Sequence, residues 1–363
     1  MMRVAKHWVV VGLDNGGTSN NATVLDSQGR FLVDRLVENA SFVLDGPEAA
    51  LNALVSAFQS VLALTGTDRR AVRAVGLDTP GPTSADGVIS SKGSTNFSEP
   101  AWRGFDVRSR LEDRLQLPVV YNNDGNAAAV YAHYQFFGRQ AADQSSVSVI
   151  VGTGLGAGVI VAGQVVRGVA GMAGELGHVY IPMAGLLEDD QPLPECNCGF
   201  TGDAESVASL KGIEKNLLPY WLRRYPDHDL NDMASTAQAA KLVRSYAEQN
   251  DPMALSILNQ QAVALGRLFT IIANFTDPTA YFLGGGVVET TARLQKWFLT
   301  TTRKNTELRE EQRRLSTLTL VPDLDMAGAR GSAIAALVSL QEPVVVSLID
   351  DVTDSTPTRY SQL

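Results

Sequence analysis

The sequence predicts an α/β protein with a duplicated, two-lobed fold and a cleft between the lobes. Strand-like and helix-like segments alternate along the chain, which is typical of helices packed on a mixed sheet. The pattern of strand, glycine-rich turn, strand, hairpin and strand occurs twice, beginning near residues 8 and 147, and such a repeat indicates a duplication. The length of 363 residues is enough for two domains of ~100–200 residues each.

Composition and charge exclude several classes of protein. Hydrophobic residues make up 45% of the chain and charged residues 19%, so the chain can build cores and is not disordered throughout. Thirty Lys and Arg residues face 39 Asp and Glu residues, a formal net charge of −9, and no basic run occurs. We therefore expect neither a nucleic acid nor a membrane as partner.

The two cysteines and the start of the chain predict a cytoplasmic location. Cys196 and Cys198 stand one residue apart and cannot form a disulfide framework for the whole chain. The apolar run at 8–13 stops at Asp14 after six residues, which is too short for an export signal or a membrane span.

The first half predicts three strands followed by alternating helices and strands. A β-branched strand at 8–13 ends in the turn at 14–18, and strands at 23–25 and 31–33 flank a hairpin signal at 26–30. Apolar residues at helical spacing then predict an amphipathic helix at 47–64. The elements expected after it are a strand at 71–77, a helix at 107–115, a strand at 117–121 and a helix at 126–137.

The second half repeats this opening and then becomes helical. The expected elements are strands at 147–151, 159–161 and 165–166, helical regions at about 204–217 and 235–276, a strand at 280–283 and a helix at 332–340. We predict a smaller lobe from residues 1–122 plus about 327–345, a larger lobe from residues 123–326, and a polar tail at 346–363.

Three glycine-rich turns stand at strand ends, at 14–18, 152–158 and 284–286. Such turns let backbone N–H groups approach a phosphate without obstruction by a Cβ atom. Neither a Walker A motif nor a dinucleotide fingerprint is present. The alternative is a plain hairpin that needs a positive φ, but three such turns, two of them inside the repeated unit, favour phosphate binding.

Polar residues in these turns suit phosphate chemistry. A carboxylate at Asp14 fits beside a phosphate only when a divalent cation lies between them, and the alternative for Asp14 is a cap of the turn. Thr18 and Thr153 can donate hydroxyl hydrogen bonds to phosphate oxygens.

Six motifs in one order carry a resemblance to a known family. They are Asp14-x-Gly16-Gly17-Thr18, Pro80-Gly81-Pro82, Asn123-Asp124-x-Asn126-Ala127-Ala128, Gly152-Thr153-Gly154-Leu155-Gly156-x-Gly158, Gly174-Glu175-Leu176-Gly177-His178 and Cys196-x-Cys198-Gly199-x-x-Gly202. Over about residues 8–340 the chain resembles the ROK family of repressors, open reading frames and sugar kinases. The resemblance implies an actin/hexokinase-like (ribonuclease H-like) two-lobed fold.

The resemblance also implies roles for individual residues. Asp124 matches the catalytic base. The residues that match ATP-binding positions are Asp14, Gly16, Gly17, Thr18, Gly152, Thr153, Gly154, Gly156, Gly284, Gly285 and Gly286. The residues that match sugar-binding positions are Asn96, Asn123, Asp124, Glu175, His178 and Glu205.

The chemistry of these residue types agrees with those roles. Phosphoryl transfer to a sugar needs a carboxylate that accepts the hydroxyl proton as the O–P bond forms, and Asp124 follows a buried strand at the expected cleft. Its alternative role is the N-cap of the helix at 126–137. Asn, Glu and His side chains are the donors and acceptors that read sugar hydroxyls, although Asn96 also suits a loop turn.

In the family, a histidine and three cysteines bind structural zinc. Here Asp203 occupies the position of the third cysteine, so the implied ligands are His178, Cys196, Cys198 and Asp203, in a loop at 178–205. A carboxylate oxygen is an accepted zinc ligand. The alternative is a zinc-free loop held by packing.

The leading hypothesis is an ATP-dependent kinase of a hexose or hexose derivative that uses Mg²⁺. The family also contains sugar-responsive transcriptional regulators, which need a helix-turn-helix domain before the first strand, and the start of this chain leaves no room for one. A non-catalytic sugar-binding protein is a third possibility. Family members are often dimers, so the resemblance implies a homodimer.

Overall fold

The computed structural model describes residues 7–81, 83–90 and 97–340 of the chain. Two five-stranded mixed sheets form its framework. The first sheet contains β1 (Val9–Asn15), β2 (Ser19–Asp26), β3 (Val37–Ala40), β4 (Val72–Thr79) and β5 (Val119–Asn123). The second contains β6 (Ser146–Val151), β7 (Leu155–Val161), β8 (Gln164–Val165), β9 (Ala280–Gly284) and β10 (Thr317–Leu320).

The two sheets have the same topology. The first has the strand order β3-β2-β1-β4-β5, and the second, followed from its other edge, has the order β8-β7-β6-β9-β10. In each sheet the first three strands along the chain are antiparallel neighbours and the last two are parallel additions. The duplication predicted from the repeated strand pattern is confirmed.

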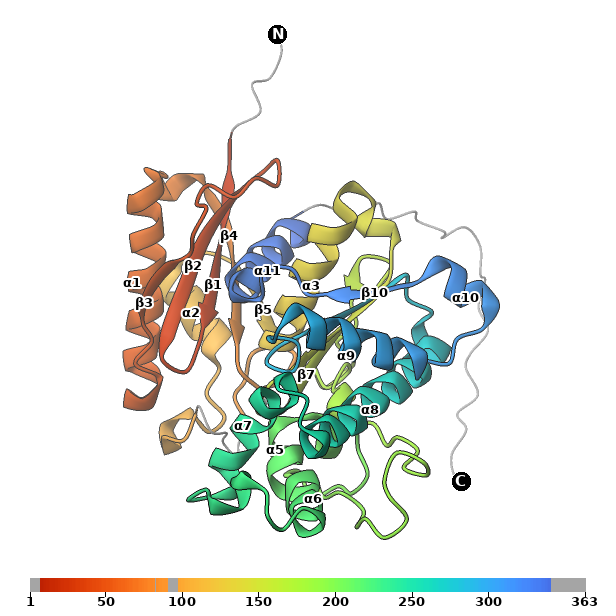
Figure 1. Ribbon diagram of the computed structural model, residues 1–363. Helices are drawn as coiled ribbons and strands as arrows, with labels where there is room; N and C mark the ends of the chain where they lie inside the picture. The colour runs from red at the N-terminus through yellow and green to blue at the C-terminus, as the bar shows by residue number, and fades with distance from the viewer. Residues whose placement is uncertain (1–6, 82, 91–96, 341–363) are drawn as a thin grey trace, which may run out of the picture.

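Helices cover the sheets in layers (Figure 1). The cluster of apolar residues on one face of the first sheet includes side chains of α1 (Pro47–Thr65) and α2 (Val107–Leu115). Between the two sheets lie α3 (Asp124–Phe137) and α11 (Leu324–Ser339), which pack on each other. The remaining helices, which accompany the second sheet, are α4 (Glu205–Ala208), α5 (Leu210–Gly212), α6 (Leu218–Arg224), α7 (Thr236–Glu248), α8 (Pro252–Thr276), α9 (Ala292–Lys304) and α10 (Glu310–Leu315).

The last helix, α11, approaches the first sheet closely at glycines. A Cβ atom on Gly12 of β1 would lie 2.0 Å from the Ala329 carbonyl oxygen, and one on Gly76 of β4 would lie 1.8 Å from that of Ser332. Any side chain at these positions would separate the helix from the sheet. Helix α11 therefore covers a sheet whose strands all come from the first 123 residues of the chain.

Two helices are long and apolar enough to cross a membrane by length and composition, α1 and α8. This is weak evidence, because core helices of folded domains pass the same test. Of the apolar window in α8, 67% is buried inside the protein, and its side chains belong to the large core of the second sheet. In α1 the buried share is 44%, which fits a helix with one face on a sheet.

Some local predictions differ from the structure. The predicted third strand at 31–33 is wrong, because Phe31 forms only an isolated bridge with Leu25, and β3 instead pairs Val37–Ala40 with the start of β2. The strand β10 and the helices α9 and α10 were not predicted. Asn96 and the tail at 346–363 lie outside the described residues.

Candidate active site

Three neighbouring parallel strands of the first sheet deliver polar residues to one edge. Asp14, near the end of β1, is the register partner of Asp78 on β4. Asp78 is in turn the partner of Asn122 on β5, and Asp124 follows that strand directly. Carboxyl ends of parallel strands meet at the same edge of a sheet, where ligands of α/β proteins bind. The topology thus gathers three carboxyl groups that are far apart in sequence.

Asp124 is the first residue of α3, and the N-cap of that helix is Asn123, whose Oδ1 accepts the Asn126 N–H at 2.8 Å. The alternative role of Asp124 as N-cap is therefore wrong. Its side chain remains exposed to solvent, yet protein surrounds it on most sides, as at the floor of a cleft. This burial, with the charges of Asp14 and Glu175, raises its pKa to about 6, although its carboxylate accepts the Gly125 N–H.

Asp14 and Asp78 form a pair of carboxyl groups that interact by a hydrogen bond. Asp78 is 1% exposed, and its burial, followed by the charge of Asp14, raises its pKa well above the ordinary value. Ser332 of α11 donates to Asp78 Oδ1 at 2.9 Å, and Asn21 donates to Asp14 Oδ2 at 3.0 Å. Asp78 is therefore the member of the pair that holds the proton.

The first glycine turn, at 14–18, joins β1 to β2. The Gly16 N–H donates to the Ser19 carbonyl at 3.0 Å, and a Cβ on Gly16 would lie 2.7 Å from that oxygen. The hairpin itself thus requires this glycine. Thr18 is exposed beyond it, where its hydroxyl is accessible to a ligand.

The second glycine turn leaves open space where side chains would stand. The turn itself is Gly152-Thr153-Gly154, closed by the Gly152 N–H to the Gly154 carbonyl at 2.9 Å, while Gly156 lies within β7. A Cβ on Gly152 or Gly156 would meet nothing within 4 Å. None of the three glycines has a positive φ, so the plain-hairpin explanation is wrong for this turn.

A pocket of about 330 Å³ brings the second and third glycine turns together. Gly152 and Thr153 form one side, and Gly286 forms another. Gly285 has a φ of 84°, and a Cβ there would lie 2.4 Å from the Val151 carbonyl, so only glycine lets this turn reach the end of β6. The other lining residues include apolar side chains of Leu210, Ile213, Leu258 and Val287 and the cations Lys241 and Arg244.

Glu205 connects the second glycine turn to the cysteine loop. Its Oε2 accepts the Leu155 N–H at 2.7 Å, and its Oε1 accepts the Cys196 thiol at 3.4 Å. Glu175 lies near enough to feel the charges of Glu205 and His178, and its pKa is raised, chiefly by burial. The predicted sugar-binding residues Glu175, His178 and Glu205 are therefore neighbours, and the charge of Glu175 also reaches Asp124.

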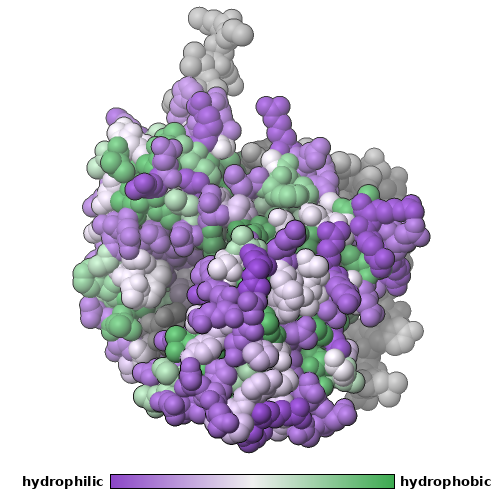
Figure 2. Space-filling view, viewed as in Figure 1, coloured by the Kyte–Doolittle hydropathy of each residue, from purple (hydrophilic) through white to green (hydrophobic). Residues whose placement is uncertain are grey.

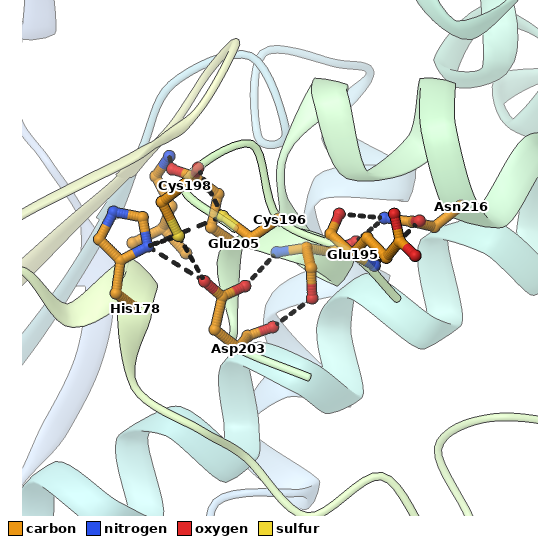
Figure 3. Close-up of polar contacts among 9 residues, drawn as sticks. His178, Glu195, Cys196, Cys198, Asp203, Glu205 and Asn216 are labelled. Atoms are coloured by element: carbon orange, nitrogen blue, oxygen red, sulfur yellow. Dashed lines mark hydrogen bonds and ion pairs between the residues drawn. The ribbon is translucent and has the colours of Figure 1, made fainter. Parts of the chain in front are cut away.

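The four predicted metal ligands form one cluster (Figure 3). His178 Nδ1 lies 3.0 Å from Asp203 Oδ2, 3.5 Å from Cys198 Sγ and 3.8 Å from Cys196 Sγ, and all four ligand atoms lie within 4.8 Å of one another. A tetrahedral zinc site with bonds of about 2.0–2.3 Å has ligand–ligand distances of about 3.3–3.8 Å. The donor set fits zinc, and the Cys198 and Cys196 distances from His178 lie within that range.

Local structure explains how this cluster forms. His178 ends a short 3₁₀ helix, Leu176–His178, and the adjoining Tyr180 forms a bridge with Asp203. Gly199, with a φ of 95°, turns the loop back after Cys198. Asp203 is fully buried, and its Oδ1 accepts the Ser206 N–H at 2.8 Å, which leaves Oδ2 directed at the cluster.

Sequence reasoning missed several residues at these sites. Asp78 carries no local motif, and only the sheet order places it beside Asp14. Lys241 and Arg244 come from α7, which is distant in sequence from every glycine turn. Arg167 donates to the Tyr121 carbonyl at 3.0 Å and to Asn122 Oδ1 at 2.9 Å, and thereby ties the two halves together beside Asn123.

The repeated sheet with glycine turns at its strand ends defines an actin/hexokinase-like fold. The ROK family profile matches residues 10–339, and the chain belongs to this family. The ROK hexokinase structure from Thermus thermophilus is similar to it, with 29% identity, a TM-score of 0.72, and coverage of 91% of this chain and 98% of that one. A Streptomyces griseus ROK glucokinase in complex with glucose and AMPPNP has 28% identity and a TM-score of 0.63, covering 90% and 99%.

Curated relatives extend this comparison. A glucokinase from Halalkalibacterium halodurans is 31% identical over 283 residues, which are 76% of this chain and 80% of that protein. An N-acetyl-D-glucosamine kinase from Salmonella arizonae is 28% identical over 288 residues, covering 77% and 85%. The Bacillus subtilis xylose repressor is 27% identical over 280 residues, covering 77% and 64%.

Proposed function

We propose that this protein is an ATP-dependent sugar kinase that phosphorylates a hydroxyl of a hexose or hexose derivative, with Asp124 as the general base. One observation carries the proposal. A solvent-accessible carboxylate with a pKa of about 6 stands at the start of α3, beside the Asp14–Asp78 pair. A base whose pKa lies just below neutrality is ionised at working pH and still accepts a proton readily. Relatives that are glucokinases and an N-acetyl-D-glucosamine kinase support the same reaction class.

ATP would occupy the pocket formed by the second and third glycine turns. Its apolar side chains offer a surface for the base, and the exposed Gly152-Thr153 backbone is open for phosphate oxygens. Arg244 donates to the Gly286 carbonyl and so holds the third turn in place. The exposed Lys241 adds a positive charge near the polyphosphate.

Mg²⁺ fits the carboxyl pair at the ends of β1 and β4. Hard divalent cations prefer carboxylate oxygens, and both carboxyl groups have raised pKa values, chiefly because of burial. When bound, the cation would neutralise charge on the transferring phosphoryl group. Asp14 is the half-buried member and would be the residue that reaches it.

The sugar would lie between Asp124 and the neighbouring group of Asn123, Glu175, His178 and Glu205. Glu205 accepts two hydrogen bonds, and the one from the Leu155 N–H joins its Oε2 to the end of the second glycine turn. Asp124 would accept the proton of the attacking hydroxyl, and the Gly125 N–H would hold its carboxylate in orientation. Asn96 is the remaining predicted sugar ligand and lies outside the described residues.

Structural zinc would be held by His178, Cys196, Cys198 and Asp203. Bound there as thiolates, Cys196 and Cys198 would hold the cysteine loop closed around the metal, and the proton that the Cys196 thiol now donates to Glu205 would be released. A homodimer and a cytoplasmic location stay predictions.

A coupled ADP-release assay over a sugar panel tests the proposal. The assay compares single sugars at saturating ATP and Mg²⁺: glucose, fructose, mannose, allose, N-acetylglucosamine and N-acetylmannosamine. A reaction without sugar serves as the blank. We expect at least one sugar to stimulate ADP release and to yield a phosphate ester detectable by mass spectrometry. ADP release that no sugar stimulates, in a folded sample, would contradict the proposal.

A further inference from the structure

A second pocket lies at the opposite end of the second sheet from the glycine turns. Its volume is about 260 Å³, and its walls come from the end of α9, the start of β10 and the segment between them. Figure 1 shows α9, α10 and β10 side by side at the right of the molecule. Thr317, which lines the pocket, begins β10 and pairs with Ala280, the first residue of β9. The third glycine turn follows the other end of β9, at Gly284.

Three cations line this pocket, Arg303 and Lys304 at the end of α9 and Arg313 on α10. None of the described residues that line it is acidic. Within residues 7–81, 83–90 and 97–340, none of the three forms an ion pair with a carboxylate. Figure 2 shows hydrophilic side chains gathered over α10. The pocket therefore carries a positive charge that the described part of the protein leaves uncompensated.

A structural role accounts for only part of this charge. Arg303 and Lys304 stand in the last turn of α9, where cations stabilise a helix through its dipole. Arg313 belongs to a different helix, and within the described part of the chain its guanidinium donates to the backbone carbonyl of Leu308, at 3.1 Å, which fixes the guanidinium at the pocket. Helix stabilisation does not explain why these three side chains surround one cavity.

Tyr281 supplies an independent observation. Its side chain lines the pocket and is 3% exposed, and its hydroxyl makes no hydrogen bond to any residue of the described chain. The hydroxyl oxygen is not among the buried polar atoms that lack a partner, so it is accessible from the pocket, where an acceptor on a ligand can receive its hydrogen bond. Burial raises the pKa of Tyr281, so the hydroxyl keeps its proton and can donate it.

The floor of the pocket is apolar. The ring of Phe269 lies 5.1 Å from the ring of Tyr281, centroid to centroid, and Leu308 and Leu318 also line the cavity. A fully hydrated inorganic anion gains little from such a floor, whereas a carbon body would bury its surface there. The volume falls below the ~300–1,000 Å³ of sites for drug-sized ligands, which favours a small molecule over a nucleotide.

We propose that this pocket binds a small organic phosphate, a phosphate monoester whose dianion contacts Arg303, Lys304 and Arg313 and whose carbon body rests on Phe269. Tyr281 donates to a phosphate oxygen. Guanidinium groups bind phosphate in a bidentate manner, and the ammonium group adds a point charge. The pocket is separate from the proposed catalytic site, and its occupancy does not depend on the proposed kinase activity.

Titration calorimetry with glycerol 3-phosphate as probe tests the pocket, with glycerol and inorganic phosphate as comparison ligands. We expect saturable binding of one glycerol 3-phosphate per chain, weaker binding of inorganic phosphate and none of glycerol. Arg313→Gln and Lys304→Gln should each weaken binding about tenfold, because each removes a charge-assisted hydrogen bond. Tyr281→Phe keeps the ring packing and should weaken binding by a smaller factor.

Arg314→Gln is the matched control. Arg314 is the neighbour of Arg313, carries the same charge and pairs with Glu310 instead of lining the pocket. Its substitution should leave the affinity unchanged, and ligand-free thermal unfolding shows that each variant is folded. The proposal is overturned by absence of saturable binding, by equal losses in the Arg313 and Arg314 variants, or by inorganic phosphate binding as tightly as the ester. An affinity that Arg313→Gln and Lys304→Gln leave unchanged also overturns it, because the probe then binds elsewhere.

Discussion

Asp78 lies directly beside Asp14 on the neighbouring parallel strand, and the two carboxyl groups interact by a hydrogen bond. Two carboxyl groups this close do not both ionise readily, because like charges repel at short range. Ser332 from the last helix donates to Asp78, so the pair is also tied to α11. The carboxyl pair therefore links β1, β4 and α11, and it lies beside the proposed base, Asp124.

Replacing the proposed base removes catalysis and spares binding. Asp124→Asn keeps the shape of the side chain and an acceptor for the Gly125 N–H, but it cannot take the hydroxyl proton. We expect kcat to fall by about 10²–10⁴-fold, with sugar affinity by equilibrium titration largely unchanged. Asp143→Asn, an exposed substitution outside the site, serves as control. Turnover near the wild-type rate in Asp124→Asn would rule out the assignment.

The pH dependence of the reaction follows the pKa of the base. Asp124 must be ionised to accept a proton, and its pKa is raised to about 6. The value of kcat/KM should therefore fall about tenfold per pH unit below about pH 6 and level off above it. Initial rates between about pH 4.5 and 8 at constant ionic strength, a range that spans the pKa of the base, measure this limb. A profile that is flat through pH 6 would disagree with the role of Asp124.

Asp78 should affect stability with a defined sign. Its folded pKa lies well above 3.8, so the stability it contributes is present below its unfolded pKa and is lost as the pH rises through the folded value. Asp78→Asn imitates the protonated form, so its free energy of unfolding should decline less from pH 5 to pH 9 than that of the wild type.

Asp78→Ala provides the contrast. It leaves Ser332 without its acceptor and opens a cavity, and we expect a loss of about 2 kcal/mol at pH 5. Urea unfolding at both pH values measures all three proteins. Identical pH slopes for wild type and Asp78→Asn would show that Asp78 does not hold a proton in the native state.

Substitution by alanine should affect ligand binding at Gly152 and folding at Gly76. A Cβ on Gly152 meets nothing within 4 Å, so Gly152→Ala should unfold at the wild-type temperature while its methyl group obstructs a phosphate. We expect KM for ATP to rise about tenfold. A Cβ on Gly76 would lie 1.8 Å from a backbone oxygen, so Gly76→Ala should fail to fold. An unchanged KM for Gly152→Ala would remove the phosphate role from this turn.

Zinc content tests the cysteine loop. The purified protein should contain about one zinc per chain by mass spectrometry of the metal, and Cys198→Ser should lower the zinc affinity at least about tenfold because a thiolate ligand is lost. Glu195→Gln, next to Cys196 and outside the ligand set, is the matched control. A full complement of zinc in Cys198→Ser would exclude the proposed ligands.

The sequence was sufficient to predict the strands and helices that depend on short-range patterns of apolar residues. The β-branched runs before each glycine turn predicted β1 and β6, and the helical spacing of apolar residues predicted α1 almost to the residue, because one buried face repeats in both cases. The metal cluster was predicted from the resemblance to the ROK family, whose motifs cover His178 and the loop that holds the other three ligands.

The elements and site residues that could not be predicted depend on contacts between segments that are far apart in the sequence. The alternation of Thr and Leu in β10 spans only four residues, too short a run to predict a strand by itself, and the strand forms because β9 offers a free edge. Asp78 acquires its significance only from the register of β1 and β4. Lys241, Arg244 and the pocket around Arg313 likewise depend on how distant helices pack.

The placement of α11 has a consequence for the order of events during synthesis. Residues 7–123 form the strands of the first sheet, but the helix that packs on β1 and β4 through Gly12 and Gly76 emerges from the ribosome only after residue 339. Until then the part of the first sheet that α11 covers lacks this helix, although α3 can already pack against β4 and β5. Contacts of such long sequence separation form late in folding, because the whole chain between β5 and α11 must be present before they can be made.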